Sequence, residues 1–119
     1  MASVKVFCVS EIWYFQIIPP NDSDSNMGIS VGYQTKEECI RGISDFKDLV
    51  AENVIDSSKS PFVLINGEET EYYFHYFDEK GKEIYSSHRY WHKPNACDGV
   101  EAIFRYISNE QLEKIIFEE

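Results

Sequence analysis

The sequence predicts an α+β fold made of two consecutive β-β-β-α units. Short runs rich in β-branched and aromatic residues are followed twice by a longer segment with an apolar stripe at helical spacing. This pattern of three strands and a helix returns about 57 residues after it first appears. The chain has 119 residues, 43% of them hydrophobic, which is enough for one core. We therefore expect a single domain over residues 1–119.

The first unit occupies about residues 4–58. Its β-branched and aromatic side chains predict strands at residues 4–9 and 12–18. Two prolines and a polar turn, residues 19–26, end the second strand. A third, short strand is expected around residues 27–33.

The helix of the first unit has a start signal and a buried stripe. Thr35 and Glu38 have the spacing of a capping box, in which each side chain bonds to the backbone amide of the other residue. Apolar residues then recur at helical spacing and predict the face that packs on the sheet. These residues are Cys39, Ile43, Phe46 and Val50.

The second unit, about residues 61–117, repeats this order. Strands are expected at residues 62–65, 71–77 and 84–90. Pro94 suits the first turn of a helix, where a missing amide costs no hydrogen bond. The apolar stripe of this helix consists of Ala96, Val100, Ile103 and Ile107.

The C-terminal segment is open to two interpretations. Ser108 and Gln111 form a second, weaker capping box, so we expect a terminal helix over residues 109–117. A final strand is the alternative.

Several residues of the two units match at one spacing. Each unit carries the motif Ser-x-x-Tyr-x-x-Lys, with a Gly nine residues after the Tyr. The matching pairs are Ser30 and Ser87, Tyr33 and Tyr90, Lys36 and Lys93, and Gly42 and Gly99. With these motifs the chain resembles the tandem form of the YegP-like domain family, small bacterial proteins of uncharacterised function.

The resemblance covers nearly the whole chain and implies more than the residue pattern does. It implies one antiparallel sheet shared by both units, with the helices packed on one face and a pseudo-twofold axis between the units. The chain departs from the family pattern at residues 19–26 and 102–104, which puts any shared ligand surface in doubt. Features common to both copies are read as scaffold, so a specific function is expected where the copies differ, at residues 19–26 and 88–92.

Charge and cysteine usage exclude several classes of protein. The 21 acidic and 11 basic residues give a net charge of −10, which disfavours binding to nucleic acid and anionic membranes. Imitation of a nucleic acid by these carboxylates is a third possible function. Cys8, Cys39 and Cys97 lack metal-ligand spacing and are expected to be reduced. No signal peptide or membrane-spanning run is present, so we expect a soluble, cytoplasmic protein. Because two fused units can supply what a dimer of single units would, we expect a monomer or a weak homodimer.

The candidate ligand-binding residues are His88, Arg89, Tyr90 and His92. They lie in residues 87–92, the densest group of imidazole, guanidinium and phenol side chains in the sequence, at a junction of strand and helix. The segment suits an anion. A metal pair of His88 and His92 is disfavoured, because a spacing of four does not bring side chains together outside a helix. No catalytic residue, metal site or cofactor is assigned.

Three further features have structural explanations. Gly42 and Gly99 lie inside helices, which indicates a close approach of a neighbouring element rather than of a ligand. Residues 22–26 begin like a calcium loop but lack its Gly and Glu, and are read as a turn. The aromatic strand at 71–77 alternates between two faces, and its outer face suits a protein partner or a second copy better than RNA.

The sequence thus favours a non-enzymatic binding or interaction module that recognises a protein or a small ligand. The alternative is a small enzyme acting on an anionic substrate at residues 87–92.

Overall fold

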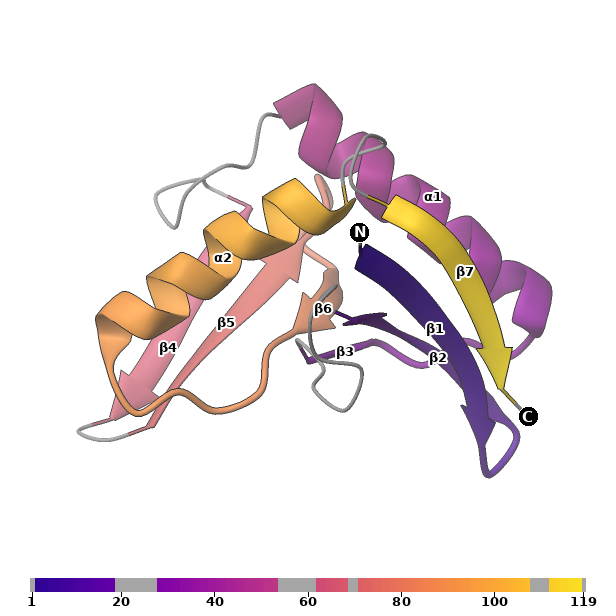
Figure 1. Ribbon diagram of the computed structural model, residues 1–119, viewed down its shortest axis with the longest axis horizontal. Coiled ribbons are helices and arrows are strands. Elements are labelled where there is room, and N and C mark those ends of the chain that lie inside the picture. The colour runs from indigo at the N-terminus through magenta and orange to yellow at the C-terminus, as the bar shows by residue number, and fades with distance from the viewer. Residues whose placement is uncertain (1, 19–27, 54–61, 69–70, 108–111, 119) are drawn as a thin grey trace.

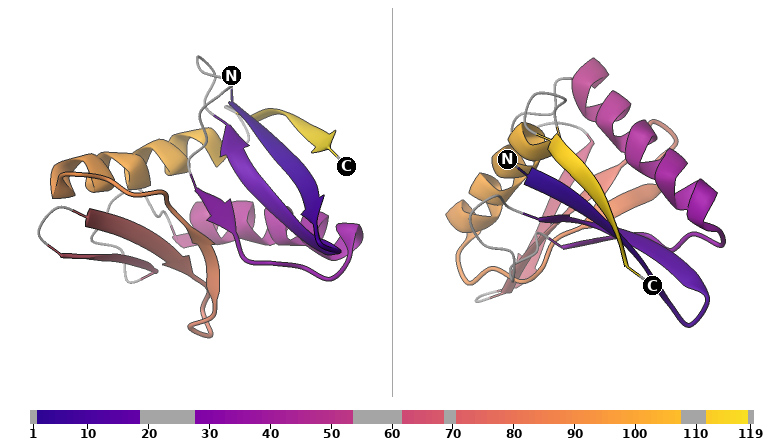
Figure 2. Two further views of the ribbon diagram at one scale, coloured as in Figure 1. Left: turned by 90° about the horizontal axis from the view of Figure 1, so that it is seen from below. Right: turned by 45° about the vertical axis from the view of Figure 1, so that its right-hand side comes forward.

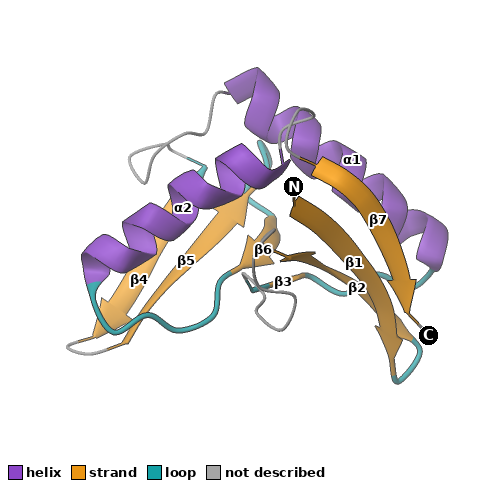
Figure 3. Ribbon diagram, viewed as in Figure 1, coloured by secondary structure: helices purple, strands orange, loops and turns teal. Residues whose placement is uncertain are grey.

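The computed structural model describes residues 2–18, 28–53, 62–68, 71–107 and 112–118 (Figure 1). Within these ranges, two helices and seven strands follow one another in the order β-β-β-α-β-β-β-α-β (Figure 3). The elements are β1 (Ala2–Val9), β2 (Ile12–Ile18), β3 (Ile29–Ser30), α1 (Lys36–Asn53), β4 (Val63–Glu68), β5 (Glu71–Phe77), β6 (Glu83–Ser86), α2 (Lys93–Ile107) and β7 (Leu112–Glu118). The predicted α+β class is confirmed. The predicted turn at residues 22–26 lies outside the described residues.

The strands form two sheets, with the orders β2-β1-β7 and β3-β6-β5-β4. The expectation of one antiparallel sheet is therefore wrong. The physical reason lies along β2, where two backbone amides are bonded by hydroxyl oxygens instead of a neighbouring strand. The Phe15 amide donates to Ser30 Oγ at 2.9 Å, and the Ile17 amide donates to Tyr85 Oη at 3.0 Å. A regular ladder from β2 to β3 cannot form beside these side chains.

In the described part of the chain, a backbone bridge still joins the two sheets. Trp13 and Tyr33 exchange both of their backbone hydrogen bonds, each 2.8 Å long. This bridge ties β2 to the segment that leads from β3 into α1.

The C-terminal segment is a strand, and the predicted helix over residues 109–117 is wrong. Strand β7 runs parallel to β1, with Val4 opposite Ile115 and Val6 opposite Phe117. The seven residues of β7, four apolar and three charged, suit a helix and a strand equally well, and the outer edge of β1 supplies backbone partners that a short helix would not use. Ser108 and Gln111 lie outside the described residues.

The helices bury the stripes that their spacing predicts. In α1 the stripe residues Cys39, Ile43, Phe46 and Val50 are at most 2% exposed, and in α2 Ala96, Val100, Ile103 and Ile107 are fully buried. Helix α1 packs against β1 and β2, and α2 packs against β4 and β5 (Figures 1 and 2). Among the described residues, neither helix combines the length and apolar character needed to cross a lipid bilayer.

Both helices begin where the sequence indicates. The Thr35 hydroxyl accepts a hydrogen bond from the Glu38 amide at 3.1 Å, which is one half of the predicted capping box. Pro94 lies in the first turn of α2, as expected. In α2 the carbonyl of His92 accepts the amides of Asn95 and Ala96.

Each half contains the same set of contacts around its Ser and its Tyr. The Phe15 amide donates to Ser30 Oγ, and the Phe74 amide donates to Ser87 Oγ, both at 2.9 Å. The ring of Tyr33 is stacked on Phe15, and that of Tyr90 is stacked on Phe74.

The two helical glycines also have matching neighbours. A Cβ at Gly42 would collide with the Tyr33 ring and hydroxyl, and one at Gly99 would collide with the hydroxyl of Tyr90. The group that closely approaches each of these glycines, as predicted, is thus a tyrosine side chain of the same half.

Candidate functional site

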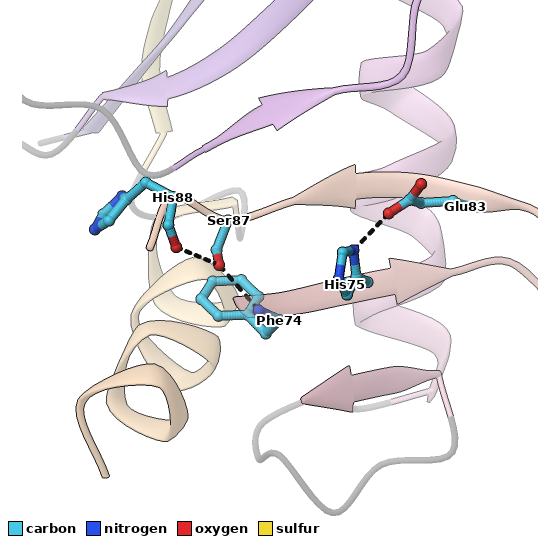
Figure 4. Close-up of polar contacts among 5 residues, drawn as sticks. All are labelled: Phe74, His75, Glu83, Ser87 and His88. Atoms are coloured by element: carbon cyan, nitrogen blue, oxygen red, sulfur yellow. Dashed lines mark hydrogen bonds and ion pairs between the residues drawn. The ribbon is translucent and has the colours of Figure 1, made fainter. Parts of the chain in front are cut away.

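The junction between β6 and α2, residues 87–92, is shaped by a buried serine. The Ser87 hydroxyl accepts the Phe74 amide at 2.9 Å and donates to the His88 carbonyl at 2.7 Å (Figure 4). His75 pairs with Ser86, whereas Tyr72 pairs with Tyr90, so three residues of the junction face two residues of β5. This is a β-bulge, and it turns the following side chains away from a regular strand.

The Tyr90 side chain packs within the fold and is not part of an open site. Its ring is stacked on His88, with centroids 4.5 Å apart, and its hydroxyl reaches the backbone at Gly99. Burial raises the pKa of the Tyr90 phenol, so the group stays protonated at neutral pH. Of the four candidate residues, Tyr90 is therefore the least available to a ligand.

Arg89 lies at the centre of an exposed cluster with Glu71 and Trp91. Its guanidinium donates to Glu71 Oε1 at 3.0 Å and lies 4.4 Å from the centroid of the Trp91 ring. The Arg89 and Glu71 side chains are 46% and 49% exposed, and Trp91 is 57% exposed. The carboxylate compensates much of the arginine charge, so this cluster is a less suitable site for a bare anion than the sequence indicated.

The two candidate histidines are separate. His88 is stacked on Tyr90, while His92 is exposed at the start of α2. Over the described ranges, no group of three or more His, Cys, Asp or Glu side chains is placed to hold a metal ion.

The outer face of β5 continues the surface of the cluster. Strand residues alternate between faces, and because Phe74 and Tyr76 are buried, Glu71, Tyr73, His75 and Phe77 face outward. Glu71, at the end of this row, is the partner of Arg89. The junction and the exposed sheet face, two separate candidates in the sequence, therefore form one continuous surface.

A histidine and a carboxylate lie in the middle of this outer face. His75 Nδ1 and Glu83 Oε1 are 2.6 Å apart, across the β5·β6 pair (Figure 4). Leu64 of β4 lies opposite His75 on its other side and is 51% exposed. The partners Glu71 and Glu83 could not be anticipated from the sequence, because both pairings depend on the register of β5 with β6 and the junction that follows it.

An open groove of about 670 Å³ lies elsewhere, between α1 and the turn from β5 to β6. Carboxylates predominate along it, among them Asp45, Asp48, Asp78 and Glu83, with Lys80 and Lys82 beside them. No junction residue and no histidine lines this groove, so it does not join the candidate residues into an acid–base site.

No protein-family model matches the sequence, and no curated protein matches it. Its backbone does match solved structures. The solution NMR structure of a UPF0339 protein from Shewanella oneidensis superposes with a TM-score of 0.74 at 14% identity, over 98% of this chain and 90% of that one. The chain has a YegP-like fold. The second match is the solution NMR structure of yegP from E. coli, a protein of unknown function, with a TM-score of 0.73 at 14% identity over 99% of this chain and 95% of that one.

The YegP-like fold agrees with the resemblance seen in the Ser-x-x-Tyr-x-x-Lys motifs. At 14% identity these similarities concern the fold alone. What the chain does must be argued from its own side chains.

Proposed function

We propose that this chain is a non-enzymatic binding module that recognises a protein partner through its junction surface, defined as Glu71, Tyr73, Arg89 and Trp91. One observation carries the proposal. The same scaffold contacts occur in both halves, but only the second half carries functional side chains on them. His88, Arg89, Trp91 and His92 follow Ser87, whereas the positions after Ser30 hold Val31, Gly32, Gln34 and Thr35.

The proposal includes a tandem duplication of one β-β-β-α unit within a single domain. The matching hydrogen bonds of Ser30 and Ser87 support it, as does the matching packing of Gly42 and Gly99. A duplicated scaffold explains why conserving these contacts does not require conserving the side chains outside them. The first junction, which lacks these charged and aromatic side chains, is then an internal control for the second.

The chemistry of the junction surface favours a protein over other ligands. Trp, Tyr and Arg dominate the energetics of protein interfaces, and Trp91 and Arg89 are both stacked and exposed. The net charge of −10 repels nucleic acid and anionic membranes. A small planar ligand stacking on Trp91 is the second candidate, since the ring has one side covered by Arg89.

The test compares partner capture from a lysate of the source organism. We expect the double variant Arg89→Ala, Trp91→Ala to lose the captured protein, because it removes the stacked pair. The matched control is Gln34→Ala, at the position equivalent to Trp91, which should capture the same protein as the unaltered chain. The exposed Arg89–Glu71 pair contributes at most about 1 kcal/mol to stability, so the double variant should remain folded. Identical partners for all three proteins would disprove the proposal.

A further inference from the structure

The groove beside α1 has a partly apolar lining. It encloses about 670 Å³ between α1 and the turn from β5 to β6 (Figure 2). Leu49, which is only 6% exposed, lines it together with the half-buried side chains of Val31, Tyr33 and Ile84. Every residue that lines the groove belongs to the described part of the chain. A concave surface of this size with apolar side chains in its lining is typical of a ligand site.

Carboxylates lie on both sides of the groove. Seven of its lining residues are acidic and three are basic. Two of the carboxylates have partners, because Asp78 accepts the backbone amides of Lys80 and Lys82, and Glu83 lies against His75. The other five make no ion pair within the described residues, and they are Glu38, Asp45, Asp48, Glu52 and Glu79. The negative charge of the groove is therefore available to a ligand.

The fold does not require the carboxylates on α1. The two helices match at an offset of 57 residues, so α2 shows what the same helical positions hold in the other half. The residues at the positions of Glu38, Asp45 and Asp48 are Asn95, Ala102 and Arg105. Helix α2 nevertheless buries its apolar stripe as α1 does. The acidic row is thus a property of this groove and not of the scaffold that the two halves share.

The spacing of the carboxylates favours a long ligand over a metal ion. Over the described ranges, no three acidic, histidine or cysteine side chains converge to hold a metal ion. From Glu38 to Glu52 helix α1 rises about 21 Å, which is the length of about six residues of extended chain. An extended segment can distribute several cations along such a row, while its apolar side chains reach Leu49 and Ile84.

We infer that this groove binds an extended basic segment of a partner polypeptide, in which apolar residues alternate with lysine or arginine. The apolar side chains of the segment contact Leu49 and Ile84, and its cations pair with carboxylates such as Asp45 and Asp48. Charge complementarity selects this occupant, since an acidic or neutral segment gains nothing from the unpaired carboxylates. The site is separate from the junction surface, because no residue of that surface lines the groove.

The test is an NMR titration of the whole protein with three matched probes. The first is the end-blocked peptide Lys-Leu-Lys-Leu-Lys-Leu, and the second has serine in place of each leucine. The third is spermidine, which has the same number of cations but no side chains. We expect the leucine peptide to shift the amide signals of Leu49 and Ile84 and to bind about threefold or more tightly than the other two probes, because it alone buries apolar side chains.

Two double variants separate the groove from the net charge of the protein. Asp45→Asn, Asp48→Asn removes two carboxylates from the groove, and the control Asp98→Asn, Glu101→Gln removes two from α2. All four side chains are exposed, so both variants should fold, which circular dichroism checks. We expect the groove variant to bind the leucine peptide about three- to tenfold more weakly, the loss expected for two exposed ion pairs, and the control to change by less than about twofold.

Several results would overturn the inference. Equal weakening in the two variants would show a diffuse attraction to the net charge, and signal shifts outside the groove would place the peptide elsewhere. No binding at millimolar leucine peptide, or equal binding of spermidine, would contradict a polypeptide occupant. Shifts of the same signals that follow protein concentration without peptide would identify a second copy as the occupant. The Arg89→Ala, Trp91→Ala variant should bind the peptide unchanged, and a loss there would assign the peptide to the junction surface.

Discussion

Ile29 lies directly opposite Ser86 in the antiparallel pair of β3 and β6. These residues are 57 positions apart, which is also the separation of Ser30 from Ser87 and of Tyr33 from Tyr90. Under a twofold relation between two halves, a residue faces its own counterpart only beside the axis. The pair Ile29 and Ser86 therefore marks where the axis of the proposed duplication would pass, and it supports that proposal independently of the sequence motifs.

The helical glycines provide the first test of the scaffold. We expect Gly42→Ala to lower the free energy of unfolding by about 1–3 kcal/mol, because the new methyl group must displace the Tyr33 ring from its stack on Phe15. Gly99→Ala should act in the same direction through Tyr90 and Phe74. Urea unfolding of the whole protein measures both effects.

The control for these variants is Ser44→Ala, at an exposed position of α1. It reports the intrinsic helix preference for alanine without a collision and should be neutral or slightly stabilising. Replacing a helical glycine by alanine gains about 1 kcal/mol where space allows. Stabilisation by Gly42→Ala and Gly99→Ala would therefore contradict the close packing.

The two buried serines, Ser30 and Ser87, provide the second test. Ser87→Ala removes the oxygen that accepts the Phe74 amide and leaves a buried donor without a partner. An unsatisfied buried donor costs about 1–3 kcal/mol, so we expect a loss of stability in this range. Ser30→Ala should cost a similar amount through the Phe15 amide. Ser86→Ala, next to Ser87 but only half-buried, should change the unfolding free energy much less.

The sequence predicts the features that depend on local spacing, but not those that depend on tertiary contacts. The helices were predictable because the stripe of Cys39, Ile43 and Phe46 follows directly from the helical period, and the period is a local property. Strand β7 was not, because its seven residues suit both structures and only the edge of β1 decides between them. The separation into two sheets likewise depends on Ser30 Oγ and Tyr85 Oη reaching β2 from elsewhere.

The candidate site, too, was predictable in part. Residues 87–92 stand out by their side-chain chemistry, which the sequence displays directly. Their interpretation changes because Glu71 compensates the charge of Arg89 and connects the junction to the outer face of β5. That contact depends on one extra residue in the bulge, and a register shift of one residue cannot be read from a single sequence.

Two buried tyrosines make a matched pair for the third test. The Tyr85 hydroxyl accepts the amide of Ile17 and so connects the second half to the first, whereas the Tyr76 hydroxyl donates to the Val100 carbonyl in α2. Tyr85→Phe leaves a buried amide unsatisfied. Tyr76→Phe removes one bond from a carbonyl that can still accept its helical partner.

We therefore expect Tyr85→Phe to cost about 1–3 kcal/mol and Tyr76→Phe clearly less. Both variants keep the aromatic ring, so packing changes little and the difference reports the hydrogen bond. The measurement is urea unfolding of the two variants side by side. An equal cost for both would show that the bond between Tyr85 and Ile17 does not hold the two halves together.

Alkaline pH provides the fourth test, through Tyr33 and Cys39. Burial raises the pKa of Tyr33 to about 12, with the negative charges of Cys39 and Asp45 acting in the same direction. Burial also raises the pKa of the Cys39 thiol to about 11. A pKa raised in the folded state means that the unfolded chain releases its proton first as pH increases.

The stability from these groups is thus complete below the unfolded pKa values, 9.0 for Cys39 and 10.0 for Tyr33, and is lost as pH rises through 11 and 12. We expect the free energy of unfolding to fall across this range, with tyrosinate absorbance developing together with unfolding. In Tyr33→Phe the phenol contribution is absent, so the decline should be shallower above pH 10. Tyrosinate absorbance that forms at full stability in the unaltered protein but is missing in Tyr33→Phe would show that Tyr33 is open to water and not packed between Phe15 and Gly42.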